Sequence, residues 1–193
     1  MEDVWNEQVA QGYDASSAHM YGPEVLGPTV DFLAQRAGHG PALEFAVGTG
    51  RVALPLAARG VPVAGIELSE PMAAGLRNKP GGGDIPVWIG DMASTTAPGE
   101  FSLVYLVYNA ITCLLTQDQQ VECFRNAARH LRPGGRFVIE VFVPDLQRLP
   151  PGETARPFHV GQHHLGFDTF DASLRVALRA RPAPRTSPCG RRQ

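Results

Sequence analysis

The sequence is poor in lysine, in cysteine pairs and in long apolar runs. Lys79 is the only lysine among 17 basic residues, and with 19 acidic residues the formal charge is −2. This balance excludes a generally cationic nucleic-acid-binding protein. The three cysteines form no CxxC pair, which argues against a disulfide framework or a structural zinc site. The longest apolar run, at 137–143, is interrupted by Glu140 and is too short to span a membrane.

The composition is that of a folded chain with an unusual tail. The 193 residues suit one domain with a sizeable core, and 44% of them are hydrophobic against 19% charged. The first 25 residues contain no apolar stretch of a secretory signal, so we expect a cytoplasmic protein. Residues 1–170 carry 11 basic and 18 acidic side chains, whereas residues 171–193 carry six Arg and one Asp. The sequence does not indicate an oligomeric state.

Short apolar runs alternate with helical patterns through the central part of the chain. Strands are predicted at 42–47, 61–66, 85–89, 101–108 and 137–143. Helices are predicted at 24–37, at 51–59, after the N-cap Ser69, and behind a capping box formed by Thr116 and Gln119. Because strands that alternate with helices form parallel sheets, the pattern predicts an α/β fold with a Rossmann-like, doubly wound, mostly parallel sheet.

Carboxylates recur where the predicted strands end, which is where open α/β sheets bind ligands. Glu44, Glu67 and Asp91 stand at these ends, beside small or turn residues. Isolated carboxylates are poor core builders, so their recurrence indicates a ligand. The segment 48–53 also matches the glycine pattern of dinucleotide-binding turns, and Glu67 follows Gly48 by 19 residues.

Two cofactors compete for this turn. A nicotinamide dinucleotide would place its pyrophosphate against the backbone amides, which makes an NAD(P)-binding oxidoreductase one interpretation. Glu44, just before the turn, would repel such an anion but suits a ligand with ammonium and sulfonium centres. Asp91 is placed to accept a hydrogen bond from an exocyclic amine such as that of adenine. A ligand with an amino-acid end, a ribose, an adenine and no phosphate is S-adenosylmethionine.

Four ordered segments resemble the motifs of class I S-adenosylmethionine-dependent methyltransferases. They are Glu-Phe-Ala-Val-Gly-Thr-Gly-Arg at 44–51, Gly-Ile-Glu-Leu-Ser-Glu-Pro-Met at 65–72, Gly-Asp-Met at 90–92 and Leu-Arg-Pro-Gly-Gly at 131–135. The likeness extends over about residues 10–170. It implies the class I methyltransferase fold and transfer of a methyl group to N, O or C of an acceptor. We expect that acceptor to be a small molecule, with no nucleic-acid or membrane partner.

The resemblance also implies roles for individual residues. The expected cofactor-binding residues are Glu44, Ala46, Gly48, Thr49 and Gly50 at the methionyl end, Glu67 at the ribose, and Leu68, Met72, Asp91 and Met92 at the adenine. Ala46 stands where the family often has glycine, and its small methyl group is expected to be tolerated. Segment 133–135 is expected to be the turn into the fifth strand.

The catalytic residues stay unassigned, because no His, Tyr or Asp stands out as a general base. Tyr13, Tyr21 and Asn109 are candidates for contact with the methionyl end or the substrate, but their spacing does not decide it. The histidines at 159, 163 and 164 have a ligand-like spacing, yet no carboxylate or cysteine pattern accompanies them. We therefore expect them in a loop and predict no metal site.

We expect four segments along the chain. They are a lead-in of about one helical turn with the first helix (1–40), the cofactor-binding core (41–145), a substrate-side extension (146–170) and an Arg-, Pro- and Ala-rich tail without regular structure (171–193). Complete members of the family continue with further strands, so the fold is expected to lack its final strands. The bias of the tail resembles out-of-frame reading of a GC-rich gene, and a basic tail that binds an acidic surface is the alternative. An active methyltransferase, a cofactor-binding but impaired remnant and an oxidoreductase stay open.

Overall fold

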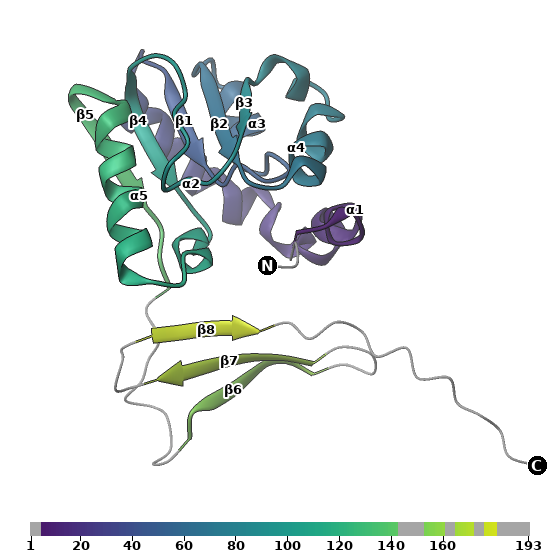
Figure 1. Cartoon of the computed structure of the whole chain (residues 1–193). Helices are drawn as coiled ribbons and strands as arrows, with labels where there is room; N and C mark the ends of the chain where they lie inside the picture. The colour runs from purple at the N-terminus through teal and green to yellow at the C-terminus, as the bar shows by residue number, and fades with distance from the viewer. Residues whose placement is uncertain (1–4, 143–152, 161–164, 172–175, 181–193) are drawn as a thin grey trace, which may run out of the picture. The chain divides into compact units, whose positions relative to one another are not determined.

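The computed structural model describes residues 5–142, 153–160, 165–171 and 176–180 (Figure 1). The chain divides into two compact units, one that ends at Val141 and one that begins at Phe142. Among the helices of the described ranges, none is both long and apolar enough to cross a membrane.

The first unit is built on a five-stranded sheet with the strand order β3-β2-β1-β4-β5. Its strands are β1 (Ala42–Phe45), β2 (Val63–Glu67), β3 (Val87–Ile89), β4 (Phe101–Leu106) and β5 (Leu131–Ile139). All four neighbouring pairs are parallel. Every residue of β1, β2 and β4 is buried, which explains their nearly continuous apolar sequence. The predicted α/β fold with a parallel, doubly wound sheet is confirmed.

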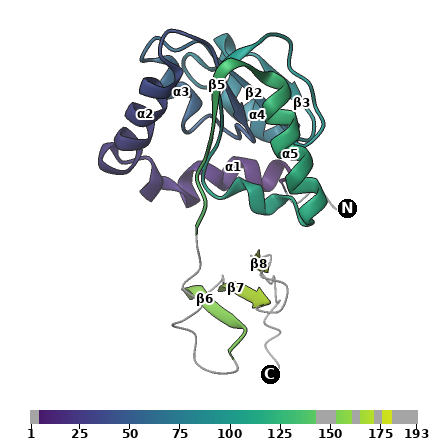
Figure 2. The same ribbon diagram turned by 90° about the vertical axis from the view of Figure 1, so that its left-hand side faces the viewer.

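Helices cover both faces of this sheet (Figure 2). They are α2 (Pro23–Ala37), α3 (Ala53–Ala57), α4 (Glu70–Arg77) and α5 (Gln117–His130), whereas α1 (Glu7–Ser16) contacts α4. On one face, Leu33 of α2 and Leu56 of α3 share an apolar cluster with Tyr105 of β4. On the other face, Cys123 of α5 shares a second cluster with Phe45 of β1. The central strands β1, β2 and β4 are thereby buried on both sides.

Two predicted helix starts are confirmed. The hydroxyl of Thr116 accepts a hydrogen bond from the backbone N–H of Gln119 at 3.2 Å, and the Gln119 side chain accepts from the N–H of Thr116 at 3.1 Å. Ser69 caps α4 in the same way, because its hydroxyl accepts from the N–H of Met72 at 3.3 Å. Each cap satisfies backbone donors that a helix leaves unpaired at its N-terminus.

The N-terminal segment contains more helix than predicted. Where about one helical turn was expected, α1 extends over ten residues, and a short 3-10 helix, η1 (Ala18–Met20), follows it. Asn6 caps α1, since its side chain accepts a hydrogen bond from the N–H of Val9 at 3.1 Å. No residue of α1 is fully buried, so the helix lacks the apolar stripe on which the sequence prediction relies.

The predicted turn at 133–135 lies inside β5 instead of before it. Leu131 pairs with Phe101 and Arg136 pairs with Leu103, so the intervening residues form an irregularity in the strand. Gly134 has a φ of 78°, a left-handed conformation that glycine adopts without a steric penalty. The glycines therefore bend a strand that begins six residues earlier than the apolar run indicated.

The second unit contains a three-stranded antiparallel sheet with the order β6-β7-β8. Its strands are β6 (Ala155–Val160), β7 (Leu165–Asp171) and β8 (Val176–Ala180). The expectation of a tail without regular structure is therefore wrong at 176–180, where Ala177 pairs with Phe170 and Leu178 with Thr169. Hydrogen-bonded pairing with β7 stabilises β8 as a strand, although the local sequence does not predict one. Residues 172–175 and 181–193 of the tail lie outside the described residues.

Candidate functional site

The turn after β1 and the carboxylate at the end of β2 form one hydrogen-bonded unit. Glu67 Oε2 accepts from the backbone N–H of Gly48 at 2.7 Å, and Oε1 accepts from the N–H of Ser69 at 2.9 Å. Gly48 and Gly50 have φ values of 57° and 81°, which favour glycine. A Cβ on Gly50 would also lie 2.3 Å from Leu76 Cδ1. The fold thus holds both predicted loops side by side at neighbouring strand ends.

Ala46 shows a constraint that the sequence did not reveal. Its φ is 54°, so a residue with a Cβ adopts the left-handed conformation just before the turn. Such a conformation costs roughly 1–2 kcal/mol for an L-residue other than glycine. The sequence-based expectation that Ala46 is tolerated considered only the size of its methyl group. In the structure, the left-handed backbone conformation is what makes alanine less favourable than glycine at this position.

Glu44 is buried against the start of α3. Its side chain is buried, and its carboxylate accepts a hydrogen bond from the hydroxyl of Tyr105 at 2.8 Å. Burial raises the pKa of Glu44 to about 8, although the Tyr105 hydroxyl, the charge of Arg51 and the N–H of Ala53 act in the opposite direction. These contacts lie within the protein, so the role of Glu44 at the methionyl end stays a prediction.

The residues predicted for the adenine follow β2 and β3. Asp91 is half-buried, and its Oδ1 accepts from the N–H of Ala93 at 2.7 Å. Leu68 is 63% exposed, an unusual degree for a leucine next to a buried strand. Met72 and Met92 are buried. Leu68 and Asp91 thus offer accessible surface at this edge of the sheet, whereas the two methionines mainly pack behind it.

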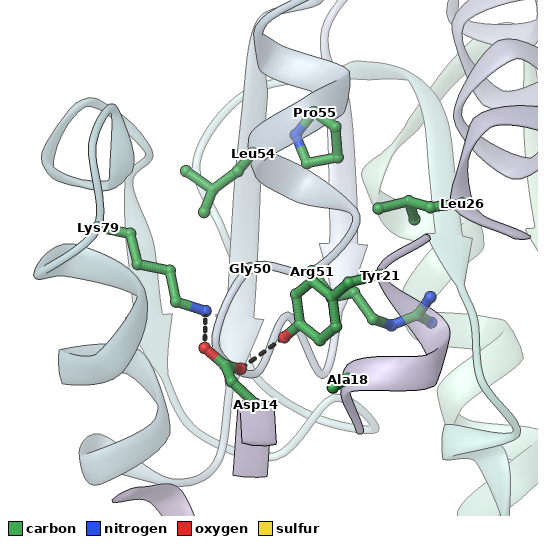
Figure 3. A pocket seen from close by; sticks show the side chains of 9 residues that line it. All are labelled: Asp14, Ala18, Tyr21, Leu26, Gly50, Arg51, Leu54, Pro55 and Lys79. Carbon is green, nitrogen blue, oxygen red and sulfur yellow. Dashed lines mark hydrogen bonds and ion pairs between the residues drawn. The ribbon is translucent and has the colours of Figure 1, made fainter. Parts of the chain in front are cut away.

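The N-terminal segment reaches both loops, a set of contacts that the sequence analysis missed. Asp14 forms an ion pair with Lys79 and accepts a hydrogen bond from the Tyr21 hydroxyl (Figure 3). It also accepts from the Thr49 hydroxyl at 2.6 Å. Lys79 also donates to the carbonyl of Thr49 at 2.7 Å. Near the second loop, the Ser69 hydroxyl donates to the carbonyl of Trp5 at 2.6 Å. The one signal in the sequence was that Lys79 is its only lysine.

The protonation states in this cluster follow from its contacts. Burial by itself raises the pKa of Asp14, but the hydrogen bonds from Lys79, Thr49 and Tyr21 outweigh burial and lower it. Burial and the neighbouring Asp14 raise the pKa of Tyr21 far above its usual value. Asp14 is therefore an ionised acceptor and Tyr21 a neutral donor at physiological pH.

A pocket of about 450 Å³ opens between the N-terminal segment, the start of α2 and the first turn of α3 (Figure 3). Asp14, Tyr21, Arg51 and Lys79 supply its polar lining, and Leu26, Leu54 and Pro55 are among its apolar residues. Gly50 is the only predicted cofactor residue in its wall. The pocket therefore adjoins the glycine turn on the α3 side and does not extend to the ends of β2 and β3.

The chain makes a strained turn directly after β4. Tyr108 and Asn109 have φ values of 55° and 60° although neither is glycine. The N–H of Tyr108 donates to Glu140 Oε2 at 2.9 Å, and the guanidinium carbon of Arg51 lies 5.0 Å from the centroid of the Tyr108 ring. Left-handed conformations of this kind are frequent at functional sites, because the surrounding contacts must maintain them.

The histidines at the end of the chain do not all lie in a loop. His159 belongs to β6, which corrects the expected loop at this position, whereas His163 and His164 lie outside the described residues. Within the part of the chain that the structure describes, no group of three His, Cys, Asp or Glu side chains is arranged to hold a metal ion.

Comparison with known proteins agrees with this geometry. A protein family described as a methyltransferase domain matches residues 42–135, which include β1 to β4 and the glycine turn. The solved structure of the CcbJ methyltransferase from Streptomyces caelestis superposes with a TM-score of 0.69 and 36% identity, over 79% of this chain and 64% of that chain. The chain belongs to the class I S-adenosylmethionine-dependent methyltransferases. The family predicted from the four motifs is therefore confirmed.

Two curated methyltransferases resemble the chain over part of their length. The cypemycin N-terminal methyltransferase of a Streptomyces species is 27% identical over 151 residues, which are 75% of this chain and 59% of that protein. The dTDP-4-amino-2,3,4,6-tetradeoxy-D-glucose N,N-dimethyltransferase of Saccharopolyspora spinosa is 34% identical over 99 residues, or 51% and 39% of the two chains. This methyltransferase chain thus spans less than two thirds of either relative.

Proposed function

We propose that this chain is an S-adenosylmethionine-dependent methyltransferase that acts on an amino group of a small molecule. The observation that carries the proposal is the pairing of the Glu67 carboxylate with the Gly48 turn at neighbouring strand ends. The choice of nitrogen over oxygen or carbon is supported by the two relatives, an N-terminal methyltransferase and an N,N-dimethyltransferase of an amino sugar nucleotide.

The residues present fit S-adenosylmethionine. Glu67 would bind the ribose hydroxyls, because a buried carboxylate at a strand end offers two strong acceptors. Asp91 would accept from the adenine amine, and the exposed Leu68 would pack against the base. The left-handed Gly48 and Gly50 add no side chain that would block the methionyl end, and the Thr49 hydroxyl is held by Asp14.

The main contribution of the protein to the reaction would be to align the methyl donor with the acceptor. When bound, S-adenosylmethionine would supply a methyl group activated by its sulfonium and would leave as S-adenosylhomocysteine. The turn at 48–50 and Glu67 would hold the donor, and alignment of two reactants is worth up to roughly 7–11 kcal/mol in favourable cases. The contacts of Asp14 with Thr49 and of Trp5 with Ser69 bring the N-terminal segment over both loops, where it would limit the access of water.

The oxidoreductase interpretation has lost its support. The glycine pattern that suggested it lies inside the segment that matches the methyltransferase domain. The Glu67 carboxylate also lies directly against the turn, where its negative charge disfavours the pyrophosphate of a dinucleotide.

Calorimetry with S-adenosylhomocysteine and with NAD⁺ tests the cofactor. We expect binding of S-adenosylhomocysteine and none of NAD⁺, and the reverse result would overturn the proposal. Transfer of a labelled methyl group to an amino sugar nucleotide, with the matching hydroxyl sugar as control, tests the acceptor atom. Label in the hydroxyl sugar alone would contradict an amine acceptor, and binding without any transfer would identify the chain as a cofactor-binding remnant.

A further inference from the structure

We propose that the guanidinium of Arg51 binds the carboxylate at the methionyl end of the cofactor. This assignment rests on the proposed function and deepens it, because none of the side chains predicted for the cofactor is a cation. Glu44, Glu67 and Asp91 match an ammonium group, ribose hydroxyls and an aromatic amine. A carboxylate at the methionyl end would therefore have no cationic partner among these side chains, and Arg51 can supply one.

Arg51 has an ion-pairing capacity that the described residues do not use. Its side chain is half-buried, and it forms no ion pair within 4.0 Å of a carboxylate among the described residues. Its polar contact is a long hydrogen bond, 3.5 Å, to the carbonyl of Met20. Lys79, the other cation of the pocket wall, is already engaged by Asp14 and the Thr49 carbonyl. Arg51 is thus the cation of this pocket that is ready for an external anion.

The position of Arg51 matches the expected place of the carboxylate. The residue directly follows Gly50, so its side chain starts at the turn that would receive the methionyl end. The charge of Arg51 lowers the pKa of Glu44, which places the guanidinium in electrostatic reach of the residue predicted for the ammonium group. A cation beside the turn complements the carboxylate of the ligand's amino-acid end.

The guanidinium is held in place by an aromatic ring. It lies over the ring of Tyr108, at 5.0 Å from the centroid, an arrangement that stabilises a cation without neutralising it. The left-handed backbone of Tyr108 and the hydrogen bond from its N–H to Glu140 fix the ring at the end of β4. Stacking leaves the edge of the guanidinium open, and this edge carries the N–H donors that bind a carboxylate in two-point contact.

The experiment compares two ligands that differ in the amino-acid end. S-adenosylhomocysteine carries the carboxylate, whereas 5′-deoxy-5′-methylthioadenosine lacks the amino-acid part altogether. By calorimetry, Arg51→Met should weaken S-adenosylhomocysteine roughly ten- to a hundredfold and leave methylthioadenosine nearly unchanged. Arg51→Lys, which keeps the charge but loses the two-point geometry, should lie between wild type and Arg51→Met.

Arg36→Met is the matched control, because Arg36 also stacks on an aromatic ring, that of Phe32 at 4.3 Å, but belongs to α2. This control should leave both affinities unchanged. Equal losses for the two ligands in Arg51→Met, or no loss for either, would overturn the assignment of Arg51 alone. If Arg51→Met does not fold, wild type is compared with Arg51→Lys instead. A loss of affinity for S-adenosylhomocysteine but not for methylthioadenosine then supports the assignment, and equal losses or no loss overturn it. Failure of the wild-type protein to bind either ligand would instead overturn the proposed function together with this assignment.

Discussion

The Glu67 carboxylate and the Gly48 backbone N–H lie 2.7 Å apart and join the end of β2 to the turn after β1. The second carboxylate oxygen accepts from the N–H of Ser69 and so fixes the start of α4 as well. The side chain proposed to bind the ribose therefore also orders the two loops that surround it. Its substitution should affect ligand binding more strongly than a surface change of equal chemistry.

Glu67→Gln should weaken the binding of S-adenosylhomocysteine roughly tenfold or more, because the charge-assisted acceptors become a neutral amide. Calorimetry measures the affinity. Glu70→Gln is the matched control, since Glu70 lies on the same helix start but is exposed and pairs with Arg77 at 2.6 Å. Unchanged affinity in Glu67→Gln would remove the ribose role of Glu67.

Glu44→Gln should flatten the dependence of stability on pH. The pKa of Glu44 rises from 4.5 to about 8 in the folded protein, so between these values the folded state keeps a proton that the unfolded state has lost. The free energy of unfolding contributed by Glu44 therefore falls as the pH rises through this window. Glutamine keeps an acceptor for the Tyr105 hydroxyl and does not ionise.

Urea denaturation of wild type and Glu44→Gln across the same pH range measures this contribution. The difference between the two profiles isolates Glu44 from the other titrating groups. The wild-type protein should lose stability relative to Glu44→Gln between about pH 5 and pH 8. Parallel profiles would show that Glu44 titrates normally in the folded protein.

Lys79→Met should release α1 from the rest of the first unit. This substitution removes both the ion pair with Asp14 and the hydrogen bond to the Thr49 carbonyl. Both side chains are partly exposed, so the expected coupling between Asp14 and Lys79 is only about 1 kcal/mol and falls with added salt.

Amide hydrogen exchange measures the loss of protection separately for each helix and strand. Amide protection should fall in α1 of Lys79→Met and stay constant in α5, which packs against β4 and β5. The double variant with Asp14→Asn measures the coupling by a thermodynamic cycle. Equal protection of α1 with and without Lys79 would contradict the anchoring role.

Ala46→Gly should stabilise the protein by roughly 0.5–1 kcal/mol, because relief of the left-handed conformation exceeds the entropy that glycine adds to the unfolded chain. Ala74→Gly is the control, since Ala74 lies in the interior of α4 and should lose about 1 kcal/mol. Thermal unfolding measures both. Destabilisation by Ala46→Gly would show that the backbone at this position is not strained.

Some features of this protein were predicted from short segments, because their cause is local. The hydrogen bonds of the Thr116 and Ser69 caps join residues three apart, so the sequence contains all of their partners. Apolar runs predicted all five strands of the first unit. For β1, β2 and β4 the reason is that a strand covered on both faces must be apolar throughout. The glycine turn and Glu67 were predicted together because parallel strands end at a common edge.

Other features required residues that lie far apart in the sequence. Asp14 meets Lys79 and Thr49 only in the folded chain, and α1 has no apolar stripe that would predict its place. The left-handed backbone of Ala46 depends on the path between β1 and α3, which residue type alone does not determine.

The amino-acid sequence by itself thus determined which segments form strands and which of these strands have a carboxylate at their end. The tertiary structure decided that Glu67 faces the glycine turn while Glu44 is buried against Tyr105. The reason is that the direction of a side chain at a strand end depends on the neighbouring strand and the covering helix. Both come from parts of the chain with no local relation to the residue itself.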